Sequence, residues 1–446
     1  MMEAKTMRSE ASRNSVLPMS RKPRVLFLAF YFPPLRCVAS LRGANMANYL
    51  VRAGWEVSVV TPDPSLWQSP DDLDRVAAEL DQSRVHRIYT GHRWRSLSSG
   101  FLKRSYGHGV KWFLEGILRR FGQMIGIDEM VGWYPEVERA CAKLRPGDVD
   151  VIMASGSPFG AFRVARRLSL RLRCPYVLDY RDLWTGNPHA RSEDRNRDER
   201  VEREVLRDCA AVSVVSPSMA GYLSDHFGVE NKVHVIPNGY APADFEGIEP
   251  TVFGHFAIVY TGVFLPPLST ADPLMRALRR LTELVPNKPL RFHYYGRSAA
   301  HVRESAKACG VEHLVEIHGV VPRRQCLAAV RGAGTAVVVI SVNDDGDLAD
   351  RGIITGKIFE PIGLKTPVLV IAPPGSDVER VVQTVGKGAV FSGSNVHGMA
   401  AFIVDLMHGK APESHQPEAY AWPNLVLKLD AMLRQSRTEG GFLAEI

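Results

Sequence analysis

Short runs of apolar, mostly β-branched residues alternate with helix-length segments along almost the whole chain, and the alternation begins twice. Such runs are typical of parallel strands that are covered on both faces by the helices between them. The first series predicts strands near 24–30, 56–61, 84–89, 149–153, 176–179, 211–215 and 233–236, with helices such as 40–53, 159–172 and 218–226 between them.

The second series follows the turn Pro237-Asn-Gly239 and a loop at 241–250 that is rich in proline, glycine and acidic residues. We therefore expect an α/β protein with two Rossmann-like, doubly wound domains that face a central cleft, with a hinge near 240–252. The second series predicts strands at 256–261, 291–295, 314–318, 335–341, 367–371 and 389–392, and helices at 271–285, 323–332, 356–363 and 376–385.

The expected organisation has four parts. Residues 1–22 are polar and are predicted to form a disordered tail. The two Rossmann-like domains are expected at 23–245 and 246–412. Residues 413–446 are expected to hold a helix at 422–435 and a tail, and to pack back on the N-terminal domain.

Composition excludes several classes of protein. The 446 residues suffice for two to three domains with cores of their own, and no apolar run approaches the length that a membrane-spanning helix requires. Six scattered cysteines without a C-x-x-C pair favour free thiols in a reducing compartment, so we expect a cytoplasmic protein. No H-E-x-x-H or G-x-S-x-G pattern occurs, so neither a metalloenzyme nor a hydrolase is predicted, and no metal ligands are assigned.

The residues that directly follow predicted strands are the best candidates for a site, because ligands of open α/β sheets bind at the carboxyl ends of the strands. After the first strand, a loop opens a helix at about Ser40 and carries Arg36 and Arg42. A helix N-terminus flanked by two cations can hold a phosphate, although a plain turn and helix cap fits equally well. The absence of G-x-G-x-x-G disfavours ordinary dinucleotide binding.

Two further segments of the first domain follow strands and suit a polar ligand. Residues 154–159 offer small side chains and hydroxyls, and Asp179-Tyr-Arg-Asp-Leu-Trp184 combines carboxylates, a cation and an aromatic face that can cover a sugar ring. The alternative for 179–184 is an internal Arg–Asp ion pair that holds the loop. The candidate acceptor or sugar contacts are Arg42, Ser155, Ser157, Asp179, Arg181 and Trp184.

The second domain contains the most specific motif. Gly356-Lys357 opens a short helix, so free amides and an ammonium group can converge on a diphosphate, and Glu360 lies one turn further on the same face, where its carboxylate can take two ribose hydroxyls. A surface pair between Lys357 and Glu360 is the alternative. Gly262 would let backbone approach a ligand closely, and Arg297 could contact a phosphate or be solvated.

Taken together, these motifs resemble the GT-B glycosyltransferases, specifically the large family 4 of retaining, nucleotide-sugar-dependent enzymes. The resemblance covers about residues 24 to 408 and includes Tyr31-Phe-Pro-Pro34 with Arg42, Gly54-Trp-Glu-Val57, Asp179-Tyr-Arg-Asp-Leu-Trp184, Ile236-Pro-Asn-Gly239 and Gly356-Lys-Ile-Phe-Glu360. Each motif alone is weak, and their order across two domains gives the resemblance its specificity.

The resemblance implies a nucleotide-sugar donor in the C-terminal domain, with Lys357 near the diphosphate, Glu360 on the ribose, and Gly262, Gly356 and Arg297 lining the pocket. The acceptor would lie against the N-terminal domain, with Asp182 near the reacting sugar.

It also implies transfer of the sugar with retention, without cofactor or metal, with Lys357 stabilising the leaving diphosphate and Asp182 as the second catalytic candidate. Products could be polysaccharides, glycolipids or natural-product glycosides. A nucleotide-sugar epimerase and a non-catalytic nucleotide-sugar-binding subunit remain as alternatives. Two positions depart from the family: Cys37-Val38 replaces a common Gly-Gly, and Gly352 replaces a common Glu.

The net charge of +7 is concentrated in one stretch. Residues 84–120 contain nine Lys or Arg and one acidic residue, interleaved with aromatic residues up to Phe121, so this stretch alone carries nine minus one, or +8. Such a pattern favours contact with an anionic membrane surface and a lipid-linked or anionic acceptor at the inner face of the membrane. An apolar helix face packed on the sheet is the alternative, and nucleic acid is disfavoured.

Overall fold

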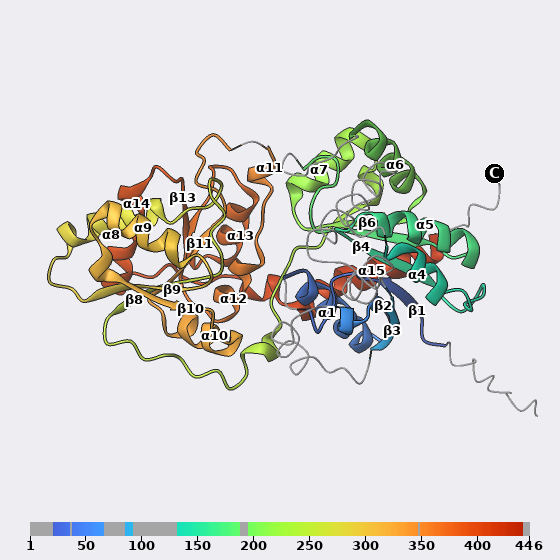
Figure 1. The fold of residues 1–446 in the computed structure, drawn as a ribbon, viewed down its shortest axis with the longest axis horizontal. Helices are drawn as coiled ribbons and strands as arrows, with labels where there is room; N and C mark the ends of the chain where they lie inside the picture. Colours follow the sequence, from blue (N-terminus) through green and yellow to red (C-terminus); the bar gives the residue numbers. More distant parts are fainter. Residues whose placement is uncertain are drawn as a thin grey trace, which may run out of the picture.

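The structure is a computed structural model, and it describes residues 21–35, 38–66, 85–91, 132–187, 195–346 and 348–439. Two lobes lie side by side, with the strands up to residue 235 in one and the strands from residue 256 to 391 in the other (Figure 1). The basic stretch 84–121 lies outside the described residues except for 85–91.

The N-terminal lobe contains a seven-stranded sheet in which every paired strand is parallel, in the order β3-β2-β1-β4-β5-β6-β7. Chain order reverses between β1 and β4, which creates the switch point where ligands bind in doubly wound sheets. All seven predicted strands are present: β1 (Arg24–Leu28), β2 (Glu56–Pro62), β3 (His86–Thr90), β4 (Val151–Gly156), β5 (Tyr176–Tyr180), β6 (Ala211–Val214) and β7 (Val233–Val235).

The C-terminal lobe repeats this plan with a six-stranded parallel sheet in the order β10-β9-β8-β11-β12-β13. Its switch point lies between β8 and β11. Its strands are β8 (Phe256–Thr261), β9 (Leu290–Tyr295), β10 (Val315–Gly319), β11 (Thr335–Val339), β12 (Val368–Ile371) and β13 (Gly388–Phe391). The expected fold class, two doubly wound α/β halves, is therefore confirmed.

The predicted helices of the N-terminal lobe occur as α1 (Val38–Arg52), α5 (Gly160–Leu172) and α7 (Pro217–Phe227). Those of the C-terminal lobe occur as α8 (Asp272–Leu284), α10 (Arg323–Gly332), α13 (Asp377–Val385), and a 3-10 turn (Gly356–Ile358) that continues into α12 (Phe359–Gly363). Helices that the sequence analysis did not specify are α4 (Tyr134–Ala140), α6 (Arg195–Asp208), α9 (Ala299–Cys309), α11 (Leu348–Arg351) and α14 (Val396–Met407).

The last helix, α15 (Trp422–Glu439), returns from the C-terminal lobe to the N-terminal lobe and packs against α1 (Figure 1). Trp422, Leu425 and Leu429 share a buried apolar cluster with Val25 and Phe27 of β1. Burying such side chains is worth about 1.5–3 kcal/mol each relative to exposure. The chain's end therefore completes the core of the lobe in which the chain began.

Besides the hinge, the two lobes also meet where α7 lies against α11 and α13. There, the Asp377 carboxylate at the start of α13 accepts a hydrogen bond from the backbone N–H of Ser218 in α7, at 2.8 Å. Asp377 is almost fully buried at this contact. A charge-assisted bond to a helix N-terminus thus links the lobes in addition to the hinge.

In the part of the chain that the structure describes, no helix has both the length and the low polarity needed to cross a membrane. All five described cysteines, Cys141, Cys174, Cys209, Cys309 and Cys326, carry free thiols.

Candidate functional site

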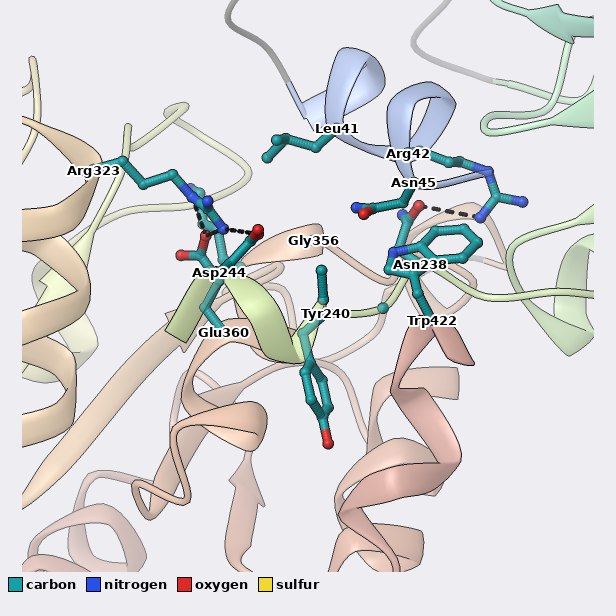
Figure 2. A pocket seen from close by; sticks show the side chains of 13 residues that line it. Leu41, Arg42, Asn45, Asn238, Tyr240, Asp244, Arg323, Gly356, Glu360 and Trp422 are labelled. Atoms are coloured by element: carbon teal, nitrogen blue, oxygen red, sulfur yellow. Dashed lines mark hydrogen bonds and ion pairs between the residues drawn. The ribbon is translucent and has the colours of Figure 1, made fainter. Parts of the chain in front are cut away.

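A cleft lies between the lobes at the hinge and holds about 590 Å³ of empty space, part of it open to solvent. Figure 2 shows Arg323, Asp244 and Glu360 on one side of it and Arg42, Asn45 and Trp422 on the other. Its walls come from α1, the hinge, the C-terminal lobe and α15. The lining residues are Leu41, Arg42, Asn45, Asn238, Gly239, Tyr240, Ala241, Asp244, Arg323, Gly356, Lys357, Glu360 and Trp422.

Lys357 supplies the cation of the C-terminal wall. The Thr355 hydroxyl caps the turn by accepting from the Lys357 N–H at 3.5 Å, while the Lys357 ammonium donates to the Tyr260 hydroxyl and the Val263 carbonyl, each at 3.2 Å. The ammonium also lies 5.2 Å from the centre of the Tyr260 ring. Desolvation by the surrounding protein lowers the Lys357 pKa to about 8.

Gly262 lies directly beneath this lysine. Its φ of +131° is one that L residues rarely adopt, and a β-carbon there would lie 2.5 Å from Cε of Lys357. Gly296 packs equally closely, because a β-carbon on it would lie 1.9 Å from the Gly262 carbonyl oxygen. Two glycines at the ends of β8 and β9 therefore allow the backbone to come close under the lysine.

Glu360 binds a partner other than Lys357. Arg323, the first residue of α10, donates to Glu360 through Nε at 3.0 Å, and its Nη2 lies 2.9 Å from Asp244 in the hinge segment. The alternative prediction, a surface ion pair between Lys357 and Glu360, is therefore wrong. Sequence analysis missed Arg323 because it lies 37 positions before Glu360 and at a helix start rather than after a strand.

Arg297, the remaining donor candidate, is exposed and is not among the residues that line the cleft. Of the five donor candidates, the structure thus places Gly356, Lys357 and Glu360 in the cleft wall and Gly262 against Lys357.

Arg42 and Asp179 form a buried ion pair between α1 and β5, with Nη2 to Oδ1 at 2.7 Å. The Arg42 guanidinium also donates to the Ile236 and Pro237 carbonyls at 2.9 and 3.0 Å. It therefore fastens α1, β5 and the hinge together while its side chain lines the cleft.

The predicted sugar contact by Asp179 is wrong for this structure, because the residue is 0% exposed and its carboxylate is fully engaged. Besides Arg42, it accepts from the hydroxyls of Ser155 and Ser213, each at 2.8 Å. Burial alone would raise the Asp179 pKa, but Arg42 and the two hydroxyls together hold that pKa below the usual range for Asp. Asp179 and Ser155 are thus parts of the support beneath the site. The ion pair of Asp179 differs from the alternative predicted for this loop, because its partner is Arg42 of α1 and not an arginine of the loop itself.

Arg181 holds the ends of three strands together. Its guanidinium donates to the Gly156 carbonyl at 3.0 Å and to the Ser157 carbonyl, and it lies 5.4 Å from the centre of the Tyr31 ring. These partners follow β4 and β1, so Arg181 fixes the strand ends at the switch point.

Asp182 and Trp184 lie on the same loop. Trp184 stacks on Phe159 with a ring separation of 5.3 Å and an angle of 3°. Asp182 is exposed, yet desolvation by the neighbouring protein raises its pKa, with Arg181 opposing the shift. A stacked tryptophan and an exposed carboxylate thus lie two residues apart on one loop.

One set of possible metal ligands comes together elsewhere, among His255, His293 and Glu316. Sequence patterns could not reveal it, because the residues lie up to 61 positions apart on three segments.

Comparison with known proteins agrees with this architecture. Residues 41–239 match the family model of the glycosyl transferase 4-like domain. No curated protein sequence matches the chain.

Solved structures match over nearly the whole chain. A sucrose-phosphate synthase from Thermosynechococcus elongatus is 15% identical, covers 94% of this chain and 98% of its own, and superposes with a TM-score of 0.56. HepE from Anabaena, solved with UDP and glucose, is 13% identical, covers 94% of this chain and 98% of its own, and has a TM-score of 0.54. A glycosyltransferase from Rickettsia africae is 13% identical, covers 94% of this chain and 97% of its own, and has a TM-score of 0.53. At these identities the likeness shows the fold, and that fold is GT-B.

Proposed function

We propose that this chain, which combines a glycosyl transferase 4-like domain with a GT-B fold, transfers a sugar from a nucleoside-diphosphate sugar to an acceptor hydroxyl with retention of configuration. The observation that carries the proposal is the placement of Lys357, which lies over Gly262 at the carboxyl end of β8 and lines the inter-lobe cleft together with Glu360.

The donor would lie with its diphosphate on the Lys357 ammonium and the backbone of Gly262 and Gly356. An ammonium in a poorly solvated site attracts phosphate more strongly than it would in water. Glu360, held by Arg323, would accept from the ribose hydroxyls. HepE has been solved with UDP, with UDP-glucose and with UDP and glucose, which supports a nucleotide sugar as donor.

In the reaction, the bond from the anomeric carbon to the diphosphate oxygen breaks, and the acceptor oxygen forms the new bond on the same face. Negative charge develops on the departing diphosphate, and the Lys357 ammonium is placed to stabilise it without a metal ion. The acceptor proton passes to the departing diphosphate, so this step requires no dedicated base beside the anomeric carbon.

The acceptor would approach from the N-terminal lobe, where Asp182, Ser157 and the Trp184–Phe159 stack surround the switch point. Asp182 would contact the reacting sugar, while Arg42, Ser155, Asp179 and Arg181 hold the surrounding loops. The acceptor class remains a polysaccharide, a glycolipid or a natural-product glycoside. The basic stretch 84–121 would bring the enzyme to an anionic surface at the inner face of the cell membrane.

The experiment begins with a thermal-shift screen of UDP-, GDP-, ADP- and dTDP-sugars in the presence of EDTA. A donor at 100 times its Kd adds about 2.7 kcal/mol to the free energy of unfolding, so the right donor stands out. The selected donor is then incubated with the protein and followed by NMR, which reports hydrolysis and the anomeric configuration of the released sugar.

Slow hydrolysis with retention supports the transferase. Inversion at C2 of the donor sugar would identify an epimerase, and binding without turnover would identify a non-catalytic subunit. Lys357→Ala should abolish turnover, whereas Lys307→Ala, which removes an exposed lysine of α9, should leave it unchanged. If Lys357→Ala kept near wild-type turnover at saturating donor, the assigned role of Lys357 would be wrong.

A further inference from the structure

Four side chains of the kinds that can ligate metals gather at the edge of the C-terminal sheet. His255 directly precedes β8, His293 lies on β9, and Glu316 and His318 lie on β10, the outermost strand. His255, His293 and Glu316 can each offer one ligand atom such that these atoms lie within 4.8 Å of one another. None of these residues lines the inter-lobe cleft.

The side chains already converge on His293. Its Nε2 lies 2.8 Å from Nε2 of His255, and its Nδ1 lies 3.0 Å from Nε2 of His318 and 3.5 Å from Oε2 of Glu316. Ligand atoms on a tetrahedral zinc ion, at roughly 2.0–2.1 Å from the metal, are about 3.3 Å apart. The separations from Nδ1 of His293 to His318 and Glu316 bracket that spacing. His255 faces the other ring nitrogen of His293, so its ligand atom, which lies within 4.8 Å of the others, would have to move closer for an ion to be held.

The surroundings hold these rings in place. Phe253 packs on the His293 ring at 4.6 Å, and Tyr295 stacks on His318 at 4.3 Å with an angle of 7°. Arg291 binds the other oxygen of Glu316, Oε1, at 3.2 Å. Partners that orient the rings and the carboxylate are what a metal site needs around its ligands.

We propose that His255, His293 and Glu316 bind one divalent transition-metal ion of the zinc class, with His318 or water in the fourth position. A site of two imidazoles and a carboxylate binds such ions in preference to Mg²⁺ or Ca²⁺, which favour oxygen ligands alone. The ion would clip together the chain before β8, the middle of β9 and edge strand β10. It is separate from the donor cleft, where transfer is proposed to need no metal, so the two proposals stand or fall independently.

The test uses the full chain without an affinity tag, stripped with a chelator. Calorimetric titration with ZnCl₂ should give one saturable equivalent and a rise in Tm that saturates with it. Titration with Co²⁺ should give the intense visible absorption of tetrahedral coordination, and X-ray absorption of the zinc form should report nitrogen and oxygen ligands.

His255→Ala and Glu316→Gln should each weaken zinc binding at least about 100-fold, the upper end of the loss seen for outer-shell partners. Both residues are only partly buried, so these variants should fold, and circular dichroism checks this. His397→Ala removes an exposed imidazole of α14 and should change nothing. The absence of saturable binding by the wild type, or equal binding by wild type and both ligand variants, would overturn the proposal and leave a hydrogen-bonded histidine chain.

Discussion

A β-carbon placed on Gly262 would lie 2.5 Å from Cε of Lys357. The glycine directly follows β8, and the lysine lies 95 positions later on the turn that opens α12. The position of the lysine therefore depends on the absence of a side chain at residue 262. The proposed diphosphate site therefore depends on the Lys357 ammonium and on the space above Gly262 that the lysine side chain occupies. Substitutions at the two residues test these features separately.

Gly262→Ala should weaken donor binding by about 10- to 100-fold, because the methyl group displaces Lys357 and the residue must keep a positive φ, which costs roughly 1–2 kcal/mol. Donor Kd from calorimetry and Tm measure the two effects. Gly254→Ala is the matched control, since a β-carbon there meets nothing within 4 Å. Wild-type donor affinity in Gly262→Ala would contradict this view of the site.

The Lys357 pKa of about 8 predicts how activity depends on pH. The ammonium is the form that attracts a diphosphate, so kcat/KM for the donor should be flat below about pH 8 and fall up to about tenfold per pH unit above it. Lys357→Arg should remove this decline, because guanidinium stays charged. A profile in which wild type and Lys357→Arg decline together would assign the titration to another group.

The same shift predicts a stability effect in the donor-free protein. Between pH 8 and the ordinary lysine pKa of 10.5, the unfolded chain binds more protons at this residue than the folded chain does. The free energy of unfolding should therefore rise with pH across that window in the wild type relative to Lys357→Met. Urea unfolding at several pH values measures the difference.

The Arg42–Asp179 pair should behave as a coupled unit. Arg42→Met leaves a buried, uncompensated carboxylate and should cost about 3–5 kcal/mol, whereas adding Asp179→Leu should recover part of that loss. Because the Asp179 pKa is lowered, the pair's contribution is present above the usual Asp pKa and is lost as pH falls through the folded value. A double-mutant cycle by urea unfolding checks this, and strictly additive losses would show that the residues are not coupled.

Arg323→Met should raise the donor KM about tenfold with little change in kcat. Without Arg323, the Glu360 carboxylate is no longer held in the orientation that suits the ribose. The lost contact is one that the ground state and the transition state share, so the loss appears in KM. Its neighbour Arg324 donates instead to the Gly247 carbonyl on the surface, which makes Arg324→Met the matched control. Equal KM values for the two variants would remove Arg323 from the site.

Glu202 is fully buried on α6, and desolvation raises its pKa to about 7 although Thr185 donates to its carboxylate. Between pH 4.5 and 7 the folded state binds more protons here than the unfolded state, so this residue's contribution to stability falls as pH rises through that window. Glu202→Gln should add about 1–3 kcal/mol at pH 8 and remove that slope. Thermal unfolding from pH 4.5 to 8 tests it, and a Tm unchanged at pH 8 would count against the raised pKa.

Glu202 also shows where sequence reasoning failed. Between residues 191 and 208, six arginines and seven acidic residues predict a solvated loop and helix start. The structure has a helix at 195–208 that buries Glu202, Val205 and Leu206 on one face. Alternating charges hid a narrow apolar stripe, because charge content does not reveal which face a helix turns to the core.

The sequence by itself determined the repeated alternation of strands and helices, hence both sheets, and it located Gly356, Lys357 and Glu360, because strand runs and the glycine–lysine turn are local patterns with local physical causes. Only the tertiary structure decided that Arg42 neutralises Asp179 from 137 positions away, that Arg323 holds Glu360, and that three histidines meet around β9. These relationships depend on which strand ends are brought together by packing. Packing depends on the burial of whole helices and strands, so residues that it brings together show no characteristic spacing in the sequence.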